Sequence, residues 1–471
     1  MLLGLDAIAI TAGWALAGWF TGGTRNGALE TTLALGLMVP TTLLLLMTHR
    51  LYLARVCSLR AVETERLGRA VTLAAIVAAL SRAVVPIPLT DSWLVAGGFL
   101  GFAFLYLSRS AYRGWLTGQR RAGRFQRSVV VVGTNSEAAQ LCQIVADHPE
   151  LGFDVIGTIG DAQPRLGHSP DVRHLGSFGD LVEVLSEHGV TGAIVATTAM
   201  TSDQLNLLTR TLLTLGIHVH LSSGLLGISH SRLRAQPLAH EPLFYVEPLR
   251  LAGWQVALKR AIDMVLGSVG LIVMAPLVVF IAIVIKLDSP GPVFFRQTRV
   301  GRNGRHFSMV KLRTMVVDAE SRYSDLAATM SGRTGPLVKL REDPRITIVG
   351  RFLRATSIDE LPQLFNVVMG SMSLVGPRPN LLVEAAGLDP VFLAQKGRMR
   401  PGITGLWQVE ARDNPSFNAY RRLDLFYLEN WSTGLDLAIL LATFHSVVSR
   451  AVRHILGRPG VRVGSAALAL E

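Results

Sequence analysis

Cysteine is scarce in this 471-residue sequence, which contains only Cys57 and Cys142. The two lie far apart and neither belongs to a CxxC pair, so we expect neither a disulfide nor a metal site from them. Seven tryptophans and seven tyrosines are too few and too scattered to line a nucleic-acid groove together with basic residues. Zinc-finger, P-loop and metalloprotease motifs are also absent from the sequence. We therefore predict no nucleic-acid partner.

Acidic residues are outnumbered, because 34 Asp and Glu face 46 Lys and Arg and leave a formal net charge of +12. Hydrophobic residues make up 49% of the chain. A long chain that is both basic and apolar predicts several structural units and anionic partners. A membrane fits both properties.

Four apolar runs of nearly membrane-spanning length occupy roughly residues 2–20, 31–48, 70–88 and 93–108. The first lacks a basic start and leads into further apolar segments, so it is not a cleaved signal peptide. Arginines cluster in the second loop and after the fourth run. The positive-inside rule then places both ends of this block in the cytoplasm. We predict a four-helix transmembrane region over residues 1–110 and a basic cytoplasmic linker over 111–127.

From Ser128 onward the hydrophobic pattern is typical of an α/β domain. The segments "SVVVVGTN", "DVIGTIGD", "GAIVATT" and "IHVHLS" have the pattern of short buried strands. We predict a Rossmann-like domain over residues 128–240 and a linker over 241–258. The domain is degenerate, because the first turn keeps only Gly133 of GxGxxG and does not support a dinucleotide site. His218 and His220 share one strand face, but no third metal ligand is apparent, and strand alternation explains their spacing.

Residues 264–285 form an uncharged run long enough to cross a bilayer. Basic residues flank both of its ends, which marks both as cytoplasmic. Pro276, near the middle, permits a bend. A further crossing would also export everything downstream. We predict a re-entrant membrane helical hairpin over residues 259–287, with a fifth crossing kinked at Pro276 as the alternative.

Downstream, "PGPVFFRQTRVGRNGRHFSMVKLRTM" contains Asn303-Gly304, a strong signal for a two-residue turn between extended segments. Basic residues along such a ribbon can simply protect a sheet edge. In "SLVGPRPN", the prolines on either side of Arg378 stiffen the backbone that presents its guanidinium, or they only form a turn.

The stretch "SIDELPQLFN" allows two interpretations. Ser357 and Glu360 fit a capping box, and the apolar residues that follow fit one helical face ending at Gly370. A capping box leaves Asp359 unexplained, and Pro362 just past the first turn should kink the helix.

Adjacent carboxylates on a helix diverge by about 100° and cannot face each other across a glycosidic bond. They suit instead one carboxylate as nucleophile beside a second acid. Arginines and a divalent cation would then draw charge from a phosphoryl centre. Mg²⁺ is the natural ion, because it needs only one or two carboxylates together with substrate phosphates.

Residues 254–455 resemble the bacterial sugar transferase family, the monotopic phosphoglycosyl transferases, through "KRAID", the ribbon above, "DPRITIVGRFLRATSIDELPQLFN", "SLVGPRP" and "PGITGLWQV". The whole chain resembles the large form of this family. The resemblance implies a membrane protein with an α-helical N-terminal bundle, an α/β Rossmann-like domain and a mixed α/β catalytic domain with a re-entrant membrane helix. The catalytic domain would cover residues 288–455 and a tail would cover 456–471.

The family's reaction transfers a sugar phosphate from a UDP-sugar to polyprenyl phosphate and so starts assembly of an exopolysaccharide, capsule or O-antigen. By this resemblance Asp359 is the nucleophile and a Mg²⁺ ligand, and Glu360 is the second acid. Pro276 marks the bend of a membrane anchor that holds the site among the lipids of the cell membrane, on the cytoplasmic side. The residues expected near the phosphates or elsewhere in the active site are Arg296, Lys311, Arg354, Arg378 and Asp436.

Three departures from the family pattern bear on details: Ala275-Pro276 replaces Ser-Pro, Ser371 replaces an acid, and Glu410-Ala411-Arg412 replaces Ser-Gly-Arg. The alternatives are an inactive membrane scaffold or regulator, and a transferase with another acceptor. The sugar, the polysaccharide pathway, any ligand of the middle domain and a homodimer contact through residues 128–240 are left open.

Overall fold

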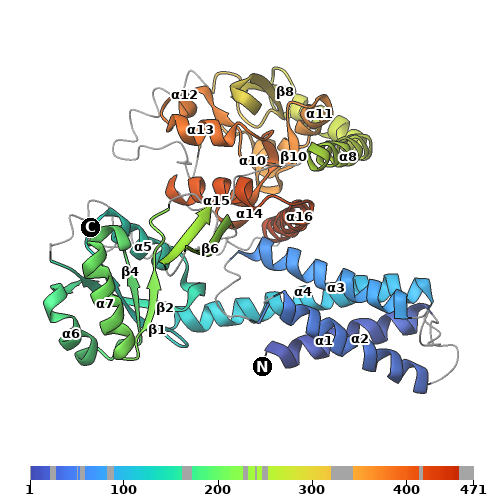
Figure 1. Cartoon of the computed structure of the whole chain (residues 1–471). Helices are drawn as coiled ribbons and strands as arrows, with labels where there is room; N and C mark the ends of the chain where they lie inside the picture. Colours follow the sequence, from blue (N-terminus) through green and yellow to red (C-terminus); the bar gives the residue numbers. More distant parts are fainter. Residues whose placement is uncertain are drawn as a thin grey trace. The chain divides into compact units, whose positions relative to one another are not determined.

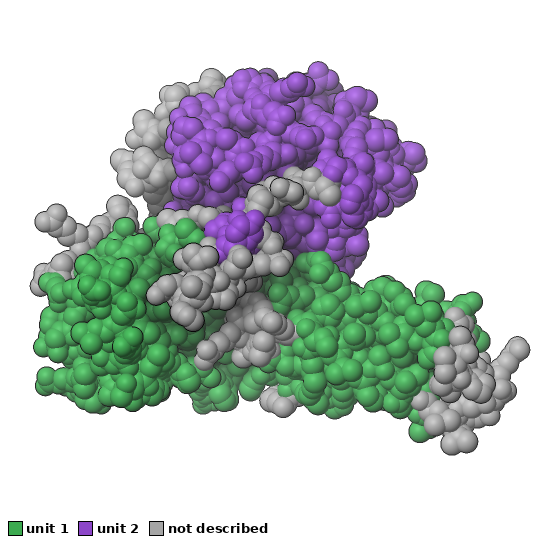
Figure 2. Space-filling view, viewed as in Figure 1, with its two compact units in different colours: residues 1–226 green, residues 227–471 purple. Residues whose placement is uncertain are grey.

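The computed structural model describes residues 2–21, 28–49, 51–52, 59–81, 90–161, 172–225, 232–238, 241–246, 253–319, 343–412 and 417–455. The chain forms two compact units, residues 1–226 and 227–471 (Figure 2). Each unit is described by itself.

The first unit begins with four helices: α1 (Leu2–Thr21), α2 (Ala28–Thr48), α3 (Arg60–Ser81) and α4 (Asp91–Arg121) (Figure 1). They enclose a core in which Trp14 packs against Trp93, with ring centroids 5.0 Å apart. The bounds of two helices differ from those predicted. Helix α3 begins at Arg60, before the apolar run, and α4 continues to Arg121 through much of the predicted linker.

Charged side chains inside this bundle connect its helices. Arg109 of α4 contacts the carboxylate of Asp6 in α1 at 2.6 Å and that of Glu63 in α3 at 3.0 Å. It also donates to the carbonyl of Leu51, just after α2, at 3.3 Å. Asp6 and Arg109 are both buried. A buried charge is tolerated only when it is paired, so this cluster fixes the register of the four helices.

A parallel sheet of the order β3-β2-β1-β4-β5 completes the first unit. Its strands are β1 (Arg127–Val132), β2 (Phe153–Ile159), β3 (His174–Gly176), β4 (Gly192–Val195) and β5 (His218–Leu221). Helices α5 (Ser136–Asp147), α6 (Leu181–Glu187) and α7 (Ser202–Thr214) cover it. Valines of β1 alternate between two cores, one on each face of the sheet. This is the strand order of a doubly wound sheet, whose ligand crevice lies between β1 and β4.

At that place the chain's own side chains contact one another. A Cβ at Gly133 would lie 2.8 Å from the Cβ of Ala199. The carboxylate of Glu137 accepts hydrogen bonds from the backbone N–H and hydroxyl of Thr198 and from the hydroxyl of Ser222. A pyrophosphate placed here would meet a like charge. The described residues hold no cluster of three or more metal-ligand side chains, and His220 packs edge-on against Phe153.

The second unit is mixed α/β. Strands β8 (Phe294–Val300) and β9 (His306–Leu312) form an antiparallel hairpin, β11 (Asn380–Leu381) joins β8, and β10 (Ser373–Val375) runs parallel to β12 (Gly402–Thr404). Strands β6 (Leu233–Leu238) and β7 (Glu241–Val246) pair with each other across the boundary predicted at 240/241. The helices are α8 (Gly253–Asp288), α10 (Ile348–Thr356), α11 (Gln363–Met369), α12 (Leu382–Ala386), α13 (Pro390–Lys396), α14 (Leu406–Glu410), α15 (Phe417–Glu429) and α16 (Thr433–Ile455).

The β8–β9 turn has three residues and not the predicted two. A short 3₁₀ turn covers Arg302–Gly304, and the N–H of Gly301 donates to the carbonyl of Arg305 at 2.8 Å. Asn303 and Gly304 both have positive φ, 54° and 74°, which explains their residue types. The extra residue changes which strand positions share a face.

Helix α8 runs without a break through Pro276, so the two arms of the predicted hairpin are not separate helices. One side of α8 packs against the rest of the unit on both sides of the proline. Gly267 and Gly270 approach α11, whereas Ile281 and Ile285 join a core with Leu312 and Leu353. This packing offsets the hydrogen bond that the proline removes.

The "KRAID" motif anchors the start of α8 through its three charged side chains. Lys259 contacts Asp436 at 2.6 Å, and Arg260 donates to the carbonyls of Val367 and Val368 at the end of α11. Asp263 accepts the N–H of Leu374 at 3.0 Å. The motif therefore joins α8 to three other elements of the unit.

Among the described residues, four segments are long and apolar enough to cross a membrane: α1, α4, α8 and Thr433–Val452 of α16. Helix α2 contributes a shorter apolar stretch, Ala34–Thr48. Apolar helices in both units make this a membrane protein. The predicted set of four crossings did not include α16.

Candidate active site

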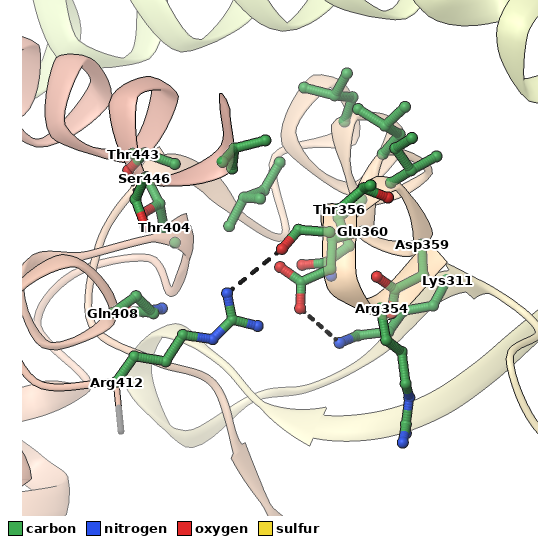
Figure 3. A pocket seen from close by; sticks show the side chains of 18 of the residues that line it. Lys311, Arg354, Thr356, Asp359, Glu360, Thr404, Gln408, Arg412, Thr443 and Ser446 are labelled. Carbon is green, nitrogen blue, oxygen red and sulfur yellow. Dashed lines mark hydrogen bonds and ion pairs between the residues drawn. The ribbon is translucent and has the colours of Figure 1, made fainter. Parts of the chain in front are cut away.

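A cavity of about 760 Å³ lies within the second unit. Its lining comes from α8, the β8–β9 hairpin, the segment from α10 to α11, the loop around Arg378, α14 and α16 (Figure 3). Met274 and Leu277 of α8 form an apolar part of the wall, whereas Asp359, Glu360 and several cations form a polar part. The cavity thus combines a charged region with an apolar one.

The acidic pair lies in a turn between two helices and not at a capped helix start. Helix α10 ends at Thr356, and Ser357 follows with a left-handed φ of 59°. Ile358–Glu360 form one 3₁₀ turn in which the Ser357 side chain makes no capping hydrogen bond, so the capping-box interpretation is wrong. Pro362 occupies the N-cap position of α11 and therefore starts that helix without kinking it.

Asn366 fixes α11 against β9 and so positions the acidic turn. Its side-chain oxygen accepts the N–H of Val310 at 3.0 Å, and its amide donates to the carbonyl of Ser308 at 2.8 Å. These contacts place Lys311, the next residue of β9, beside Glu360 with an Nζ to Oε1 distance of 3.1 Å. The "LFN" of the sequence motif is therefore a structural support.

The two acids have different electrostatic surroundings. Asp359 is only 8% exposed, and burial together with the neighbouring charge of Glu360 raises its pKa to about 6 against the opposing pull of Lys311, Arg354 and Arg412. For Glu360 burial acts in the same direction, but Lys311 and Arg412 outweigh it and lower the pKa. A pair whose pKa values are driven apart can divide roles between its members.

Cations approach the acidic turn from different elements, as Figure 3 shows. Lys311 of β9 contacts Glu360, and Arg412, just after α14, donates to the Ser357 hydroxyl at 3.4 Å. Arg354 of α10 lines the cavity, but its Nε donates to the Thr314 hydroxyl at 3.1 Å and its guanidinium points away from the acids. Lys311 and Arg354 thus both line the cavity that contains the two acids.

A second cationic group lies on the side of β8 and β11. Arg378 contacts Glu384 at 3.3 Å and stacks over Trp407 at 5.4 Å, while Arg299 donates to the carbonyl of Pro379 at 3.2 Å. Burial lowers the pKa of Arg299 to about 10, which leaves it charged at neutral pH. The Nε of Arg299, one Nη of Arg378 and the Nε1 of Trp407 are buried without a hydrogen-bond partner. Unpaired buried donors favour an anion in this part of the cavity.

A buried lysine supports the Arg378 loop from behind. Lys396 contacts the side chains of Asn380 and Tyr420 and forms an ion pair of 3.1 Å with Asp424. The loop is held on its other side by a close backbone approach, because a Cβ at Gly402 would lie 2.1 Å from the nitrogen of Gly376. "VGPRPN" and "PGITG" are thus two halves of one support.

Two predicted site residues lie outside the cavity lining. Arg296 is exposed on β8 opposite Val310, whereas the face of the hairpin that carries Lys311 takes Phe295 and Arg299. Asp436 is buried against Lys259, Tyr427 and Trp431. The structure therefore uses Asp436 to hold α8 to α16. Pro276 lies within α8, next to the lining residues Met274 and Leu277.

Sequence reasoning did not select Arg299, Trp407, Gln408, Arg412 and Arg450, all of which line the cavity. Trp407 and Gln408 lie inside the recognised "PGITGLWQV". Arg299 could have been found from strand alternation had the turn length been known. Nothing local in the sequence marks Arg450, which lies far from the other motifs.

Comparison with known families matches residues 254–450 to the bacterial sugar transferase family and residues 51–223 to a family described as a CoA-binding domain. An uncharacterized sugar transferase of Haemophilus influenzae is 41% identical over 205 residues, which cover 41% of each chain. The UDP-glucose:undecaprenyl-phosphate glucose-1-phosphate transferase of Escherichia coli is 32% identical over 360 residues, 74% of this chain and 73% of that protein.

The exopolysaccharide production protein PSS of Rhizobium leguminosarum is 39% identical over 206 residues, which are 41% of this chain and 97% of that much shorter protein. These relatives therefore cover different shares of this chain, from 41% to 74%. The chain belongs to the bacterial sugar transferase family.

Proposed function

We propose that this protein transfers a sugar 1-phosphate from a UDP-sugar to polyprenyl phosphate, most simply undecaprenyl phosphate, and so starts assembly of a surface polysaccharide. The observation that carries the proposal is the position of Asp359, a buried carboxylate beside Glu360 in a cavity with cationic and apolar walls. The name of the Escherichia coli relative supports the substrate classes.

The reaction has two displacements at one phosphorus. In the first, an oxygen of Asp359 bonds to the β-phosphorus of the UDP-sugar, the bond from that phosphorus to the bridging oxygen breaks, and UMP leaves with the electron pair. In the second, a phosphate oxygen of the lipid bonds to the same phosphorus and the bond to Asp359 breaks. The products are UMP and a polyprenyl diphosphosugar, and the carboxylate is regenerated.

The remaining residues supply charge and a proton acceptor. Glu360 takes the proton that a singly protonated lipid phosphate carries into the second step. Lys311 and Arg412 stabilise negative charge as it develops at the phosphorus, and Arg299 and Arg378 receive the phosphate that leaves. This division follows the two cationic groups of the cavity.

The donor set fits Mg²⁺ bound partly by substrate. The described residues provide two adjacent carboxylates, Asp359 and Glu360, and no cluster of three or more metal-ligand side chains. Mg²⁺ needs only one or two carboxylates when phosphate oxygens complete its shell. When bound, the ion would neutralise charge on the diphosphate.

Membrane placement completes the proposal. We place the sheet of the first unit, which we interpret as Rossmann-like, and the catalytic domain on the cytoplasmic side. Basic residues flank both ends of α8, so we propose that α8 bends at Pro276 while its helix stays continuous, enters the bilayer and returns to the same side. A homodimer through residues 128–240 stays a prediction, which cross-linking of a chain lacking them tests.

The test uses the full chain in nanodiscs with Mg²⁺, undecaprenyl phosphate and a panel of UDP-sugars, and it measures UMP. We expect UMP from one or a few donors, and Asp359→Asn should abolish it. Asp389→Asn is the matched control, because Asp389 lies on an exposed surface in an ion pair with Arg421. Turnover that survives in Asp359→Asn, or no UMP from any donor, would contradict the proposal.

A further inference from the structure

Helix α16 has two neighbouring faces of different character. Residues Thr443, Ser446, Val447 and Arg450 line the cavity at spacings that keep them on one side of the helix. The adjoining face exposes the large apolar side chains Leu437, Phe444, Val448 and Val452. Such exposure over more than four turns predicts contact with lipid, and α16 is apolar enough to enter a bilayer.

Helix α8 presents a comparable surface on its own part of the cavity wall. Met274 and Leu277 line the cavity, while Ile272, Val273 and Phe280 are more than half exposed, at 73%, 60% and 64%. The same cavity is therefore bordered by two helices with exposed apolar faces. A lipid tail held against these faces would bring its head group to the cavity.

Arg450 lies at the end of the lining face of α16. Its Nε donates to the carbonyl of Ser446, one turn earlier, at 3.3 Å, so the side chain lies back along its own helix beside the cavity. Its positive charge acts on Glu360 together with that of Arg412. In Figure 3, Ser446 and Arg412 lie across the cavity from Lys311, which reaches Glu360 from β9.

We propose that Arg450, with Arg412, binds the phosphate of the lipid acceptor, a polyprenyl monophosphate whose tail lies along α8 and α16. This assignment rests on the proposed function. A guanidinium can bind a phosphate in a bidentate way, and its charge compensates the repulsion between a lipid phosphate and Glu360. The donor diphosphate would then use the cations on the other side of the acids, Lys311, Arg299 and Arg378.

The test compares Arg450→Gln and Arg450→Lys with the wild-type chain in nanodiscs of zwitterionic lipid, and it measures the KM for undecaprenyl phosphate and for the UDP-sugar separately. We expect Arg450→Gln to raise the acceptor KM about tenfold or more, the value of one charge-assisted contact, with a much smaller change in the donor KM. Arg450→Lys should restore part of the loss. Arg421→Gln is the matched control, since Arg421 is an exposed surface arginine.

Equal increases in both KM values, or an unchanged acceptor KM, would overturn the assignment. An arginine near the end of an apolar helix can instead reach bulk lipid head groups. In that case the effect of Arg450→Gln would appear only in nanodiscs of anionic lipid and would be absent from the acceptor KM in zwitterionic ones.

Direct binding separates this inference from the proposed function. Calorimetry with farnesyl phosphate and, separately, inorganic phosphate requires no turnover. Tighter binding of farnesyl phosphate than of inorganic phosphate, weakened by Arg450→Gln, supports the lipid phosphate site even if no UDP-sugar yields UMP. Equal binding to the wild type and Arg450→Gln refutes it even if turnover is observed.

Discussion

At the scale of single residues, Asp359 and Glu360 are adjacent in sequence but differ in their burial and in their charged partners. Asp359 is buried and Glu360 is paired with Lys311 at 3.1 Å. Burial of a charged group that lacks a partner of its own costs free energy in the resting protein. In the proposed reaction the Asp359 carboxyl group loses its own charge when it becomes an acyl phosphate, and the remaining negative charge lies on the phosphoryl oxygens. The unfavourable surroundings of the carboxylate thus favour its reactivity.

The raised pKa of Asp359 predicts the pH dependence of the first step. The nucleophile must be ionised, so kcat/KM for the UDP-sugar should rise with pH and reach half its maximum near pH 6. Glu360→Gln should move the midpoint to lower pH, because it removes the neighbouring negative charge. Lys311→Met should move it to higher pH, because it removes a positive one. Midpoints that do not move in opposite directions would contradict this account.

The same burial predicts that Asp359→Asn stabilises the protein. The pKa of Asp359 is raised from 3.8 to about 6, so this group's contribution to stability is greatest at low pH and falls as the pH rises from about 4 through 6. The cost at neutral pH is at most roughly 3 kcal/mol at 1.4 kcal/mol per pKa unit.

Thermal unfolding in detergent at pH 7.5 should therefore give Asp359→Asn a melting temperature a few degrees above that of the wild type. The difference should shrink at pH 4.5, where the wild-type carboxyl is largely protonated. Asp389→Asn should show neither change. A lower melting temperature for Asp359→Asn at pH 7.5 would show that burial of the Asp359 carboxylate does not destabilise the wild-type protein.

How well individual site residues could be predicted depended on the turn between β8 and β9. A two-residue turn at Asn303-Gly304 would place Arg296 directly opposite Lys311, on the cavity face. The three-residue turn shifts the register by one and places Phe295 there, which turns Arg296 outward and Arg299 inward. Both turns suit the same dipeptide, so local sequence did not distinguish them. Asp359 and Glu360 could be selected from the sequence without knowledge of this register, because both lie within the single motif "SIDELPQLFN".

At the scale of elements, Asn366 is the connection on which the geometry of the acidic turn depends. Replacement by alanine leaves the N–H of Val310 and the carbonyl of Ser308 without their partners inside the unit. We expect Asn366→Ala to destabilise the protein by about 2–4 kcal/mol and to lower UMP formation, because Lys311 loses its fixed distance to Glu360.

Chemical denaturation followed by a UMP assay under folding conditions checks this prediction. Asn206→Ala is the matched control, because Asn206 is exposed on α7. A fully stable and active Asn366→Ala would show that α11 is held by its apolar contacts alone.

Apolar helices were only partly predictable from composition. The run at 264–285 was evident because it has no charge, but its break at Pro276 was expected from local chemistry alone. Packing of α8 against α11 and α10 keeps the helix continuous. Helix α16 was missed because Asp436, His445 and Arg450 interrupt its apolar residues. Asp436 is buried and Arg450 lines the cavity, whereas His445 is exposed, and only the tertiary structure reveals this distribution.

At the scale of the whole molecule, the composition changes along the chain predicted the order of its parts. The helical bundle, the parallel sheet and the mixed α/β unit follow one another at places where the hydrophobic pattern and the charge of the sequence change. The limit between the compact units, at residues 226 and 227, was not predicted. The sequence prediction assigned β6 to the Rossmann-like domain and β7 to the following linker, whereas the structure pairs these two strands with each other.

The second unit should carry the reaction by itself. Among the residues that the structure describes, all those that line the cavity lie between Met274 and Arg450, inside residues 227–471. The Rhizobium relative, matched over 97% of its length by 206 residues of this chain, shows that a much shorter family member exists. Helices α8 and α16 would suffice to hold the unit at a membrane. We therefore expect residues 227–471, reconstituted in nanodiscs, to form UMP with a kcat/KM within about tenfold of that of the full chain, a loss of at most 1.4 kcal/mol in transition-state stabilisation.

The comparison needs the same truncated chain with Asp359→Asn as its inactive control, and circular dichroism to show that both are folded. A folded but inactive wild-type fragment would mean that the first unit supplies something the cavity requires. Full activity would confine the bundle and the sheet to placement, regulation or assembly. In that case the crevice between β1 and β4, occupied by the carboxylate of Glu137, would have no part in the chemistry.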